Sequence, residues 1–167
     1  MVRIATENDA EQLEILNNEF NGEGETTLEN IRLSLADNKQ EVIVVDEQNE
    51  GLTGFVCVQM KKSFCYDDYM PDITEVYVKP QYRRNGIARA MITYAEEYCK
   101  IHYPLHKFEL LTGADNDSAQ IVYAKLGYCE DAELHLAKRL TRKYQGKDRY
   151  PELTSVGTFG TEFFHHQ

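Results

Sequence analysis

A basic loop with a central glycine is the first feature of this sequence that could carry chemistry: PQYRRNGIAR, residues 80–89. An apolar run precedes this loop and an amphipathic segment follows it, so a helix is expected to begin near Ile87. The first N–H groups of a helix have no partner inside it, and its N-terminus carries partial positive charge, so an anion binds there. Gly86 and Ala88 let a phosphate approach the backbone, while Arg83 and Arg84 add fixed charge. The loop is neither a Walker loop nor a dinucleotide GxGxxG loop. It predicts a site for a pyrophosphate or a 3′-phosphate.

A second block follows the amphipathic segment: NDSA at residues 116–119, then Tyr123, then LGY at residues 126–128. The two blocks read Arg83-x-x-Gly86-x-Ala88 and Asn116-x-x-Ala119-x-x-x-Tyr123-x-x-x-Gly127-Tyr128. Together they resemble the coenzyme A loop and a second motif of the GNAT acetyltransferase superfamily. The resemblance covers roughly residues 1–140. Within the superfamily, the sequence most resembles the small-molecule group that includes aminoglycoside N-acetyltransferases.

This resemblance implies an N-acetyltransferase with acetyl-coenzyme A (acetyl-CoA) as its cosubstrate. It implies a splayed strand at Glu75–Val78, where the backbone of Val76 and Val78 pairs with the pantetheine arm. Asn116 would hold the pantetheine chain by its amide, and the alternative role for this residue is a helix cap. The predicted cofactor-binding residues are Val76, Tyr77, Val78, Arg83, Arg84, Asn85, Gly86, Ile87, Ala88, Asn116 and Tyr123.

Acetylation of an amine requires two proton transfers. An alkylammonium with a pKa of about 10 must lose a proton before it attacks, and a thiolate with a pKa of about 8.5 leaves more readily when it is protonated. The resemblance implies that Glu75 binds the amine and acts as general base through water, with Asp72 as the competing carboxylate. It implies Tyr123 as the general acid. The alternatives are a solvated carboxylate at the strand end for Glu75 or Asp72, and a packing role in the core for Tyr123.

Charge bears on the acceptor. The formal net charge of −10 argues against nucleic acid as a partner and is compatible with a cationic small substrate. The resemblance implies that Glu23 and Glu25 line the acceptor pocket together with Asp72 and Glu75; the alternative for Glu23 and Glu25 is a solvated loop. The expected acceptor is therefore a primary amine of a small cationic molecule, aminoglycoside-like or polyamine-like. The alternatives are a protein lysine or N-terminal acetyltransferase and a non-catalytic module that binds coenzyme A.

The remaining composition indicates where such a protein works. Its four cysteines, Cys57, Cys65, Cys99 and Cys129, have neither CxxC nor zinc spacing, which predicts reduced thiols, no metal site and a cytoplasmic protein. No apolar run approaches the ~20 residues of a membrane span, so no membrane association is expected. A homodimer is left open.

These residues must be positioned by a mixed, mostly antiparallel sheet. Strand patterns cover residues 2–5, 41–46, 52–60, 72–79, 108–112 and 132–140, and helical spacing covers 10–20, 28–35, 87–101 and 118–126. Thr6 with Asp9 and Thr26 with Glu29 resemble capping boxes, and Gly54 indicates a bulge or a close backbone approach. The predicted fold is α/β (α+β), with a central sheet of six to seven strands and helices on both faces; by the resemblance, this is the GNAT fold. The predicted domain spans residues 1–140, and residues 141–167 are a C-terminal extension of unknown role.

Overall fold

The computed structural model describes residues 1–138, of which residues 1–130 form one compact unit. Within this unit a single sheet has the strand order β1-β2-β3-β4-β5. The first four strands pair antiparallel, and β5 pairs parallel to β4. The strands are β1 Val2–Ile4, β2 Glu41–Gln48, β3 Gly51–Lys61, β4 Met70–Val78 and β5 Glu109–Leu110.

Four α-helices accompany the sheet in the described residues: α1 Ala10–Asn21, α2 Leu28–Asp37, α3 Ile87–His102 and α4 Asp117–Leu126. Short 3₁₀ turns precede α1 at Glu7–Asp9 and α3 at Pro80–Tyr82. None of the helices in this part of the chain has the length and apolar run that crossing a membrane requires.

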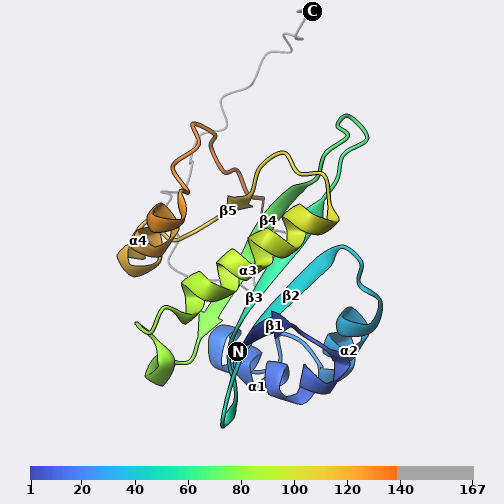
Figure 1. Ribbon diagram of the computed structural model, residues 1–167, viewed down its shortest axis with the longest axis vertical. Helices are drawn as coiled ribbons and strands as arrows, with labels where there is room; N and C mark the ends of the chain where they lie inside the picture. The colour runs from blue at the N-terminus through green and yellow to red at the C-terminus, as the bar shows by residue number, and fades with distance from the viewer. Residues whose placement is uncertain (139–167) are drawn as a thin grey trace, which may run out of the picture. The chain divides into compact units, whose positions relative to one another are not determined.

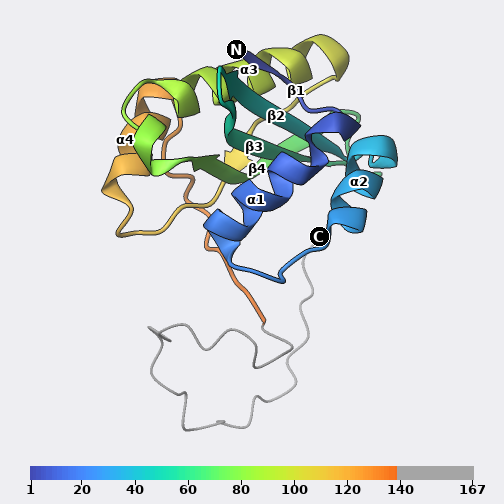
Figure 2. The ribbon, with the colours of Figure 1, turned by 90° about the horizontal axis from the view of Figure 1, so that it is seen from below.

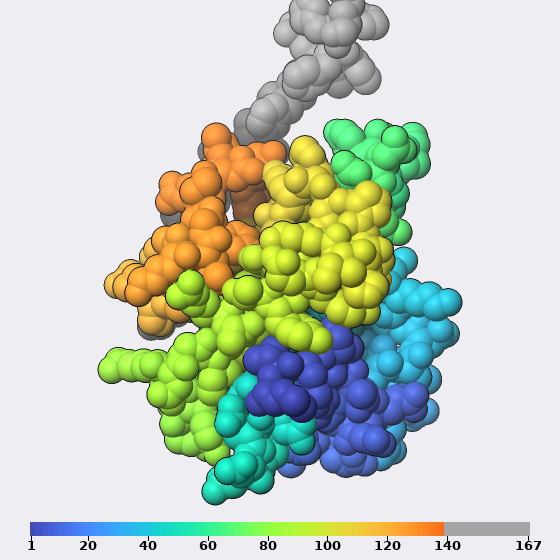
Figure 3. Space-filling view, in the orientation of Figure 1, coloured from blue at the N-terminus to red at the C-terminus, as the bar shows by residue number. Residues whose placement is uncertain are grey.

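Helices cover the sheet on both faces, as predicted (Figures 1 and 2). On one face, α3 buries Met91, Ile92, Ala95 and Cys99 against the strands, because these residues recur at three- to four-residue spacing. The helix α4 packs on the same core through Val122, Tyr123 and Leu126. On the other face, Leu13 and Leu16 of α1 pack on Val45, Phe55 and Tyr77, with Ile31 and Leu35 of α2 beside them. In the space-filling view, α3 lies across the visible face and the β3–β4 loop, residues 62–69, projects beside it (Figure 3).

Three predictions about these elements need correction. The sheet has five strands in the described residues rather than six to seven: residues 132–138 form no strand, and the rest of the predicted strand, like the extension 141–167, lies outside the described residues. Residues 132–136 alternate apolar and polar side chains, but alternation makes a strand only where a partner supplies the ladder. The strand β4 begins at Met70, two residues earlier than predicted, because β3 continues to Lys61 and pairs with it. The side chain of Thr27, not Thr26, caps α2 by accepting the Asn30 N–H at 3.2 Å.

The register between β3 and β4 shifts by one residue in the middle of the strands. Cys57 pairs with Glu75 and Val58 pairs with Ile73, so Thr74 has no partner in β3 and forms a β-bulge. On its other side, β4 pairs with β5 only at Asp72 and Ile73. The second half of β4 is therefore free along that side among the described residues.

Gly54 lies where β3 and β4 approach most closely, which confirms the predicted close backbone approach. A Cβ atom at this position would lie 2.4 Å from the carbonyl oxygen of Tyr77 and 3.2 Å from Cα of Val78. Next to it, the N–H of Lys79 donates to the carbonyl of Thr53 at 2.8 Å. Only glycine lets the two backbones meet in this way.

We therefore expect Gly54→Ala to destabilise the protein by about 1–3 kcal/mol, since backbone atoms must shift to admit the methyl group. Chemical denaturation measures this loss. Gly113→Ala is the matched control, because its Cβ would lie 3.0 Å from the flexible carboxylate of Asp115 and at an ordinary contact distance of 3.8 Å from the Cβ of Asn116. Equal stability of the two variants would contradict the close approach.

Candidate active site

The free side of β4 presents backbone groups from Val76 and Val78. Across the Gly54–Val78 pair, Lys79 N–H donates to Thr53, so the N–H and C=O of Val78 itself point away from β3. Alternation gives Val76 the same orientation, whereas the backbone of Tyr77 belongs to the ladder with Phe55. This open edge can pair with an extended, amide-containing molecule as a further strand would. Of the three residues predicted on this strand, Val76 and Val78 face the open edge and Tyr77 does not.

The N-terminus of α3 continues from this strand through the basic loop. Gly86 is the residue before the helix, with φ of 78°, a left-handed conformation that favours glycine. As in the first turn of any helix, the N–H groups of Ile87, Ala88 and Arg89 have no acceptor within α3, whose first bond is Ala90 N–H to Gly86 C=O at 2.9 Å. Gly86 has no side chain that could cap them. The first turn contains no acidic residue, and Arg84, Asn85 and Gly86 are exposed. This helix end is suited to an anion.

Arg83 connects the basic loop to the open edge. Its Nε donates to the carbonyl oxygen of Val78 at 2.8 Å, and its guanidinium lies 5.9 Å from the centre of the Tyr77 ring. The Tyr77 hydroxyl in turn donates to Glu19 of α1 at 2.8 Å. The structure thus places Arg83 at the end of the open edge, beside the strand, rather than over the first turn of α3.

The helix α4 carries the two other residues predicted from the second motif. Tyr123 is partly buried in the core beneath α3, with its ring centre 6.1 Å from that of Tyr128. Burial raises the pKa of the Tyr123 phenol above its ordinary value, because the buried site disfavours the charged phenolate. Asn116 caps α4, since its side-chain oxygen accepts the N–H of Ala119 at 3.3 Å. The capping role is confirmed, and its contact with pantetheine stays a prediction.

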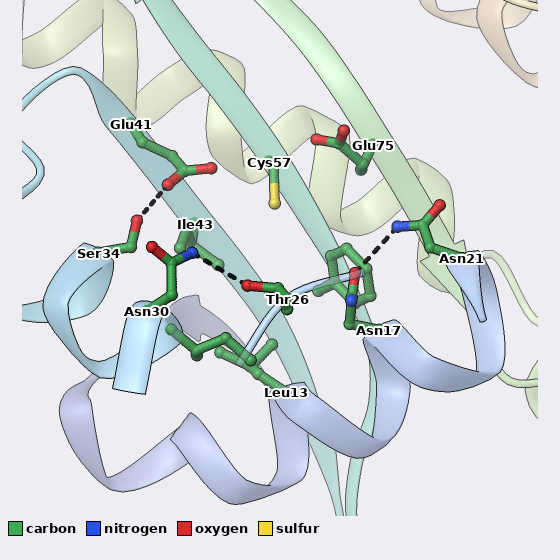
Figure 4. Close-up of a pocket in the computed structure, with 12 residues that line it drawn as sticks. Leu13, Asn17, Asn21, Thr26, Asn30, Ser34, Glu41, Ile43, Cys57 and Glu75 are labelled. Carbon is green, nitrogen blue, oxygen red and sulfur yellow. Dashed lines mark hydrogen bonds between the residues drawn. The ribbon is translucent and has the colours of Figure 1, made fainter. Parts of the chain in front are cut away.

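A cavity of about 220 Å³ lies between α1, α2 and the sheet (Figure 4). Its apolar lining consists of Leu13, Ile31, Ile43 and Phe55, and its neutral polar lining of Asn17, Asn21, Thr26, Asn30 and Ser34. Two carboxylates, Glu41 and Glu75, and the thiol of Cys57 complete it. Burial, the charges of both carboxylates and a hydrogen bond to Glu41 raise the pKa of the Cys57 thiol well above its ordinary value. The cavity thus combines apolar side chains and neutral polar groups with two carboxylates, and its thiol is neutral.

The bulge at Thr74 explains which of the predicted acidic residues enters this cavity. It turns Glu75 onto the face of Cys57, although Asp72 on the same face lies three residues before it. The Asp72 carboxylate forms an ion pair with Lys61 at 3.0 Å and does not line the cavity. Glu23 and Glu25 lie on the exposed loop between α1 and α2 and do not line it either. Among the predicted acceptor residues, the structure brings only Glu75 to the cavity.

Sequence reasoning missed Glu41, Cys57 and the carboxamides. Asn17 and Asn21 stand four residues apart on α1, where the amide of Asn21 donates to Asn17 at 2.9 Å. That spacing was the one local signal for a polar stripe on the helix. Glu41 and Cys57 lie on different strands, so only the strand register brings them together.

Comparison with known proteins shows the family. The model of the acetyltransferase (GNAT) family matches residues 10–128. The chain belongs to the GNAT family. It is therefore a GNAT acetyltransferase, which implies an acyl-CoA-dependent transferase. No curated protein matches the sequence significantly.

Solved structures share this GNAT fold at low sequence identity. A probable acetyltransferase has a TM-score of 0.70 and 23% identity, over 86% of this chain and 99% of that one. An aminoglycoside acetyltransferase from an uncultured soil metagenomic sample, in complex with sisomicin, has a TM-score of 0.72 and 14% identity, over 84% and 96%. A ribosomal-protein-alanine N-acetyltransferase from Brucella melitensis has a TM-score of 0.69 and 15% identity, over 83% and 98%. These likenesses establish the fold and leave the acceptor open.

GNAT enzymes generally use acetyl-CoA, and two features of this chain fit that molecule. The open edge at Val76 and Val78 offers donors and acceptors to the amides of a pantetheine arm. The free N–H groups after Gly86 offer an anion site for a pyrophosphate. Both features lie on one continuous stretch of chain, from Val76 to Arg89, so a single elongated cofactor can reach both.

We predict that Gly86→Asp weakens the binding of coenzyme A about tenfold or more relative to Gly86→Asn, because the added negative charge opposes the phosphate. Asn and Asp are nearly isosteric and both tolerate a positive φ, so the pair isolates the charge from the backbone effect. Calorimetric titration with coenzyme A measures both affinities. Equal affinities would show that the phosphate binds elsewhere.

Proposed function

We propose that this enzyme transfers the acetyl group of acetyl-CoA to a primary amine of a small cationic acceptor, aminoglycoside-like or polyamine-like. One observation carries the proposal: Glu75 lines the acidic cavity and directly precedes Val76, whose backbone faces the open edge of β4. An amine held at Glu75 therefore lies beside a thioester whose pantetheine arm pairs with Val76 and Val78. The proposed partner is a small molecule rather than a nucleic acid.

Glu75 has the properties that a base for this reaction needs. It lies at the edge of a cavity open to water, and the hydroxyl of Thr74 hydrogen-bonds to it. Its negative charge attracts the ammonium form of the acceptor and accepts a proton, through water, as the amine nitrogen attacks. Acetyl-CoA would supply the acetyl group as an activated thioester.

Tyr123 is proposed to return a proton to the departing sulfur. A phenol with its ordinary pKa of about 10 is protonated at neutral pH, and burial raises the pKa of Tyr123 further, so the group is available as a proton donor. The thiolate of coenzyme A is a better leaving group once it is protonated. An ammonium acceptor loses two protons on becoming an amide, one before attack and one as the C–S bond breaks; Glu75 takes them in turn through water and passes them to solvent. Tyr123 gives one proton to the sulfur and regains it from solvent, so that one proton is released in each turnover.

An assay of thiol release across a panel of amines tests the proposal. The panel contains aminoglycosides, polyamines, simple alkylamines, and peptides with a free N-terminus or a lysine. We expect amine-dependent thiol release that is largest for the small cations, and acetylation confirmed by mass spectrometry. Glu75→Gln should reduce it, with the defect shrinking as pH rises and free amine becomes available. Asp72→Asn is the matched control, because Asp72 lies outside the cavity. Turnover confined to the peptides would favour a protein acetyltransferase instead.

We predict that Tyr123→Phe lowers kcat by ~10²–10⁴-fold while the affinity for coenzyme A changes little, because the substitution removes a proton donor and almost no volume. Tyr128→Phe is the matched control: its hydroxyl donates to Glu96 at 2.7 Å, so its loss affects stability. Steady-state kinetics of both variants on the best amine measure the contrast. A wild-type kcat for Tyr123→Phe would assign this tyrosine to packing alone.

A further inference from the structure

The acidic cavity contains two carboxylates and no cation that neutralises either. None of the ion pairs in the described residues involves Glu41 or Glu75. Asp9 and Asp72, by contrast, are held by Arg3 at 2.7 Å and by Lys61 at 3.0 Å. The proposed mechanism accounts for one of the two unneutralised charges, that of Glu75. The charge of Glu41 needs a separate explanation.

Neutral donors hold the Glu41 carboxylate in a fixed position. The Ser34 hydroxyl and the Asn38 amide donate to its Oε2 at 2.5 and 3.1 Å, and the Gln59 amide donates to its Oε1 at 3.1 Å. A carboxylate has about four lone-pair sites, so these three bonds leave one on Oε1. The thiol of Cys57 is a weak donor beside it, one that an ammonium group can displace. Glu41 is thus fixed in position, with room for one strong donor on Oε1.

The two carboxylates lie on either side of Cys57 in the cavity (Figure 4). Glu41 pairs with Gln59 on β3, and Glu75 pairs with Cys57 two residues along the same strand. The spacing between strands and the rise along them place the two Cα atoms roughly 12 Å apart. Both side chains line the cavity, so the two carboxylates face the same enclosed volume.

We propose that Glu41 is a specificity-determining residue that binds a second ammonium group of the acceptor, so that the enzyme selects diamines over monoamines. This inference rests on the proposed function, in which Glu75 receives the amine that is acetylated. One end of the diamine binds at Glu75 beside the open edge of β4. The other end binds at Glu41, and the carbon chain between them crosses Cys57 and the apolar lining from Ile43 and Phe55.

The test compares α,ω-diamines, from ethylenediamine to diaminooctane, with n-alkylamines of matched length by thiol release. The wild-type enzyme should favour the best diamine over its monoamine by about tenfold or more in kcat/KM, with an optimum at an intermediate length. Glu41→Gln should abolish this preference, because kcat/KM should fall much more for the diamines than for the monoamines. Glu41→Asp withdraws the carboxylate by one methylene and should move the optimum to a longer diamine. A thermal melt of each variant confirms that it is folded.

Two results would overturn the inference while the proposed function stands: no diamine preference in the wild type, or an equal loss for diamines and monoamines in Glu41→Gln. The second result would give Glu41 a structural role. Calorimetric titration with the best-binding diamine separates the two proposals. If no amine releases thiol, but diamine binding still weakens in Glu41→Gln, the acetyl-transfer function fails and the Glu41 subsite stands.

Discussion

The strand β4 loses its neighbour after Ile73, and the rest of the site depends on that interruption. β5 pairs with only two residues of β4, and Lys61 clamps this short junction by binding both Asp72 and Glu109. Immediately beyond it, the bulge at Thr74 turns Glu75 into the cavity. One local irregularity therefore gives β4 an open backbone edge and supplies the carboxylate that faces the acceptor.

Charge separates the two proposed substrates. The N-terminus of α3 presents free N–H groups and basic residues, which suits phosphates, while the cavity between α1 and α2 presents two unneutralised carboxylates, which suits a cation. Carboxylates elsewhere in the fold, such as Asp9 and Asp72, are paired with a cationic side chain. Arg3 binds Asp9 through both of its terminal nitrogens, at 2.7 and 2.8 Å, and its hydrogen bond holds the pKa of Asp9 below the ordinary value. The two carboxylates of the cavity, by contrast, have no ion-pair partner among the described residues.

The sequence predicted what local patterns determine. Helical periodicity predicted the end of α3 to within one residue. Gly86 predicted its start, because a left-handed conformation before a helix depends on the type of a single residue. The bulge at Thr74 was not predictable in this way, since an extra residue exists only relative to the register of β3. Glu41 was missed for the same reason, because only the register of β2 on β3 and of β3 on β4 brings it to the same cavity as Glu75. A sixth strand was predicted from alternation alone, without a partner to pair with.

Amide hydrogen exchange of β4, followed residue by residue with NMR, tests the central claim most directly. If the open edge binds the pantetheine arm, coenzyme A should slow exchange at Val76 or Val78, whose N–H groups face that edge. Tyr77, between them, should change little because its N–H already pairs with Phe55. Saturating coenzyme A that leaves Val76 and Val78 exchanging as in the free protein would contradict the account.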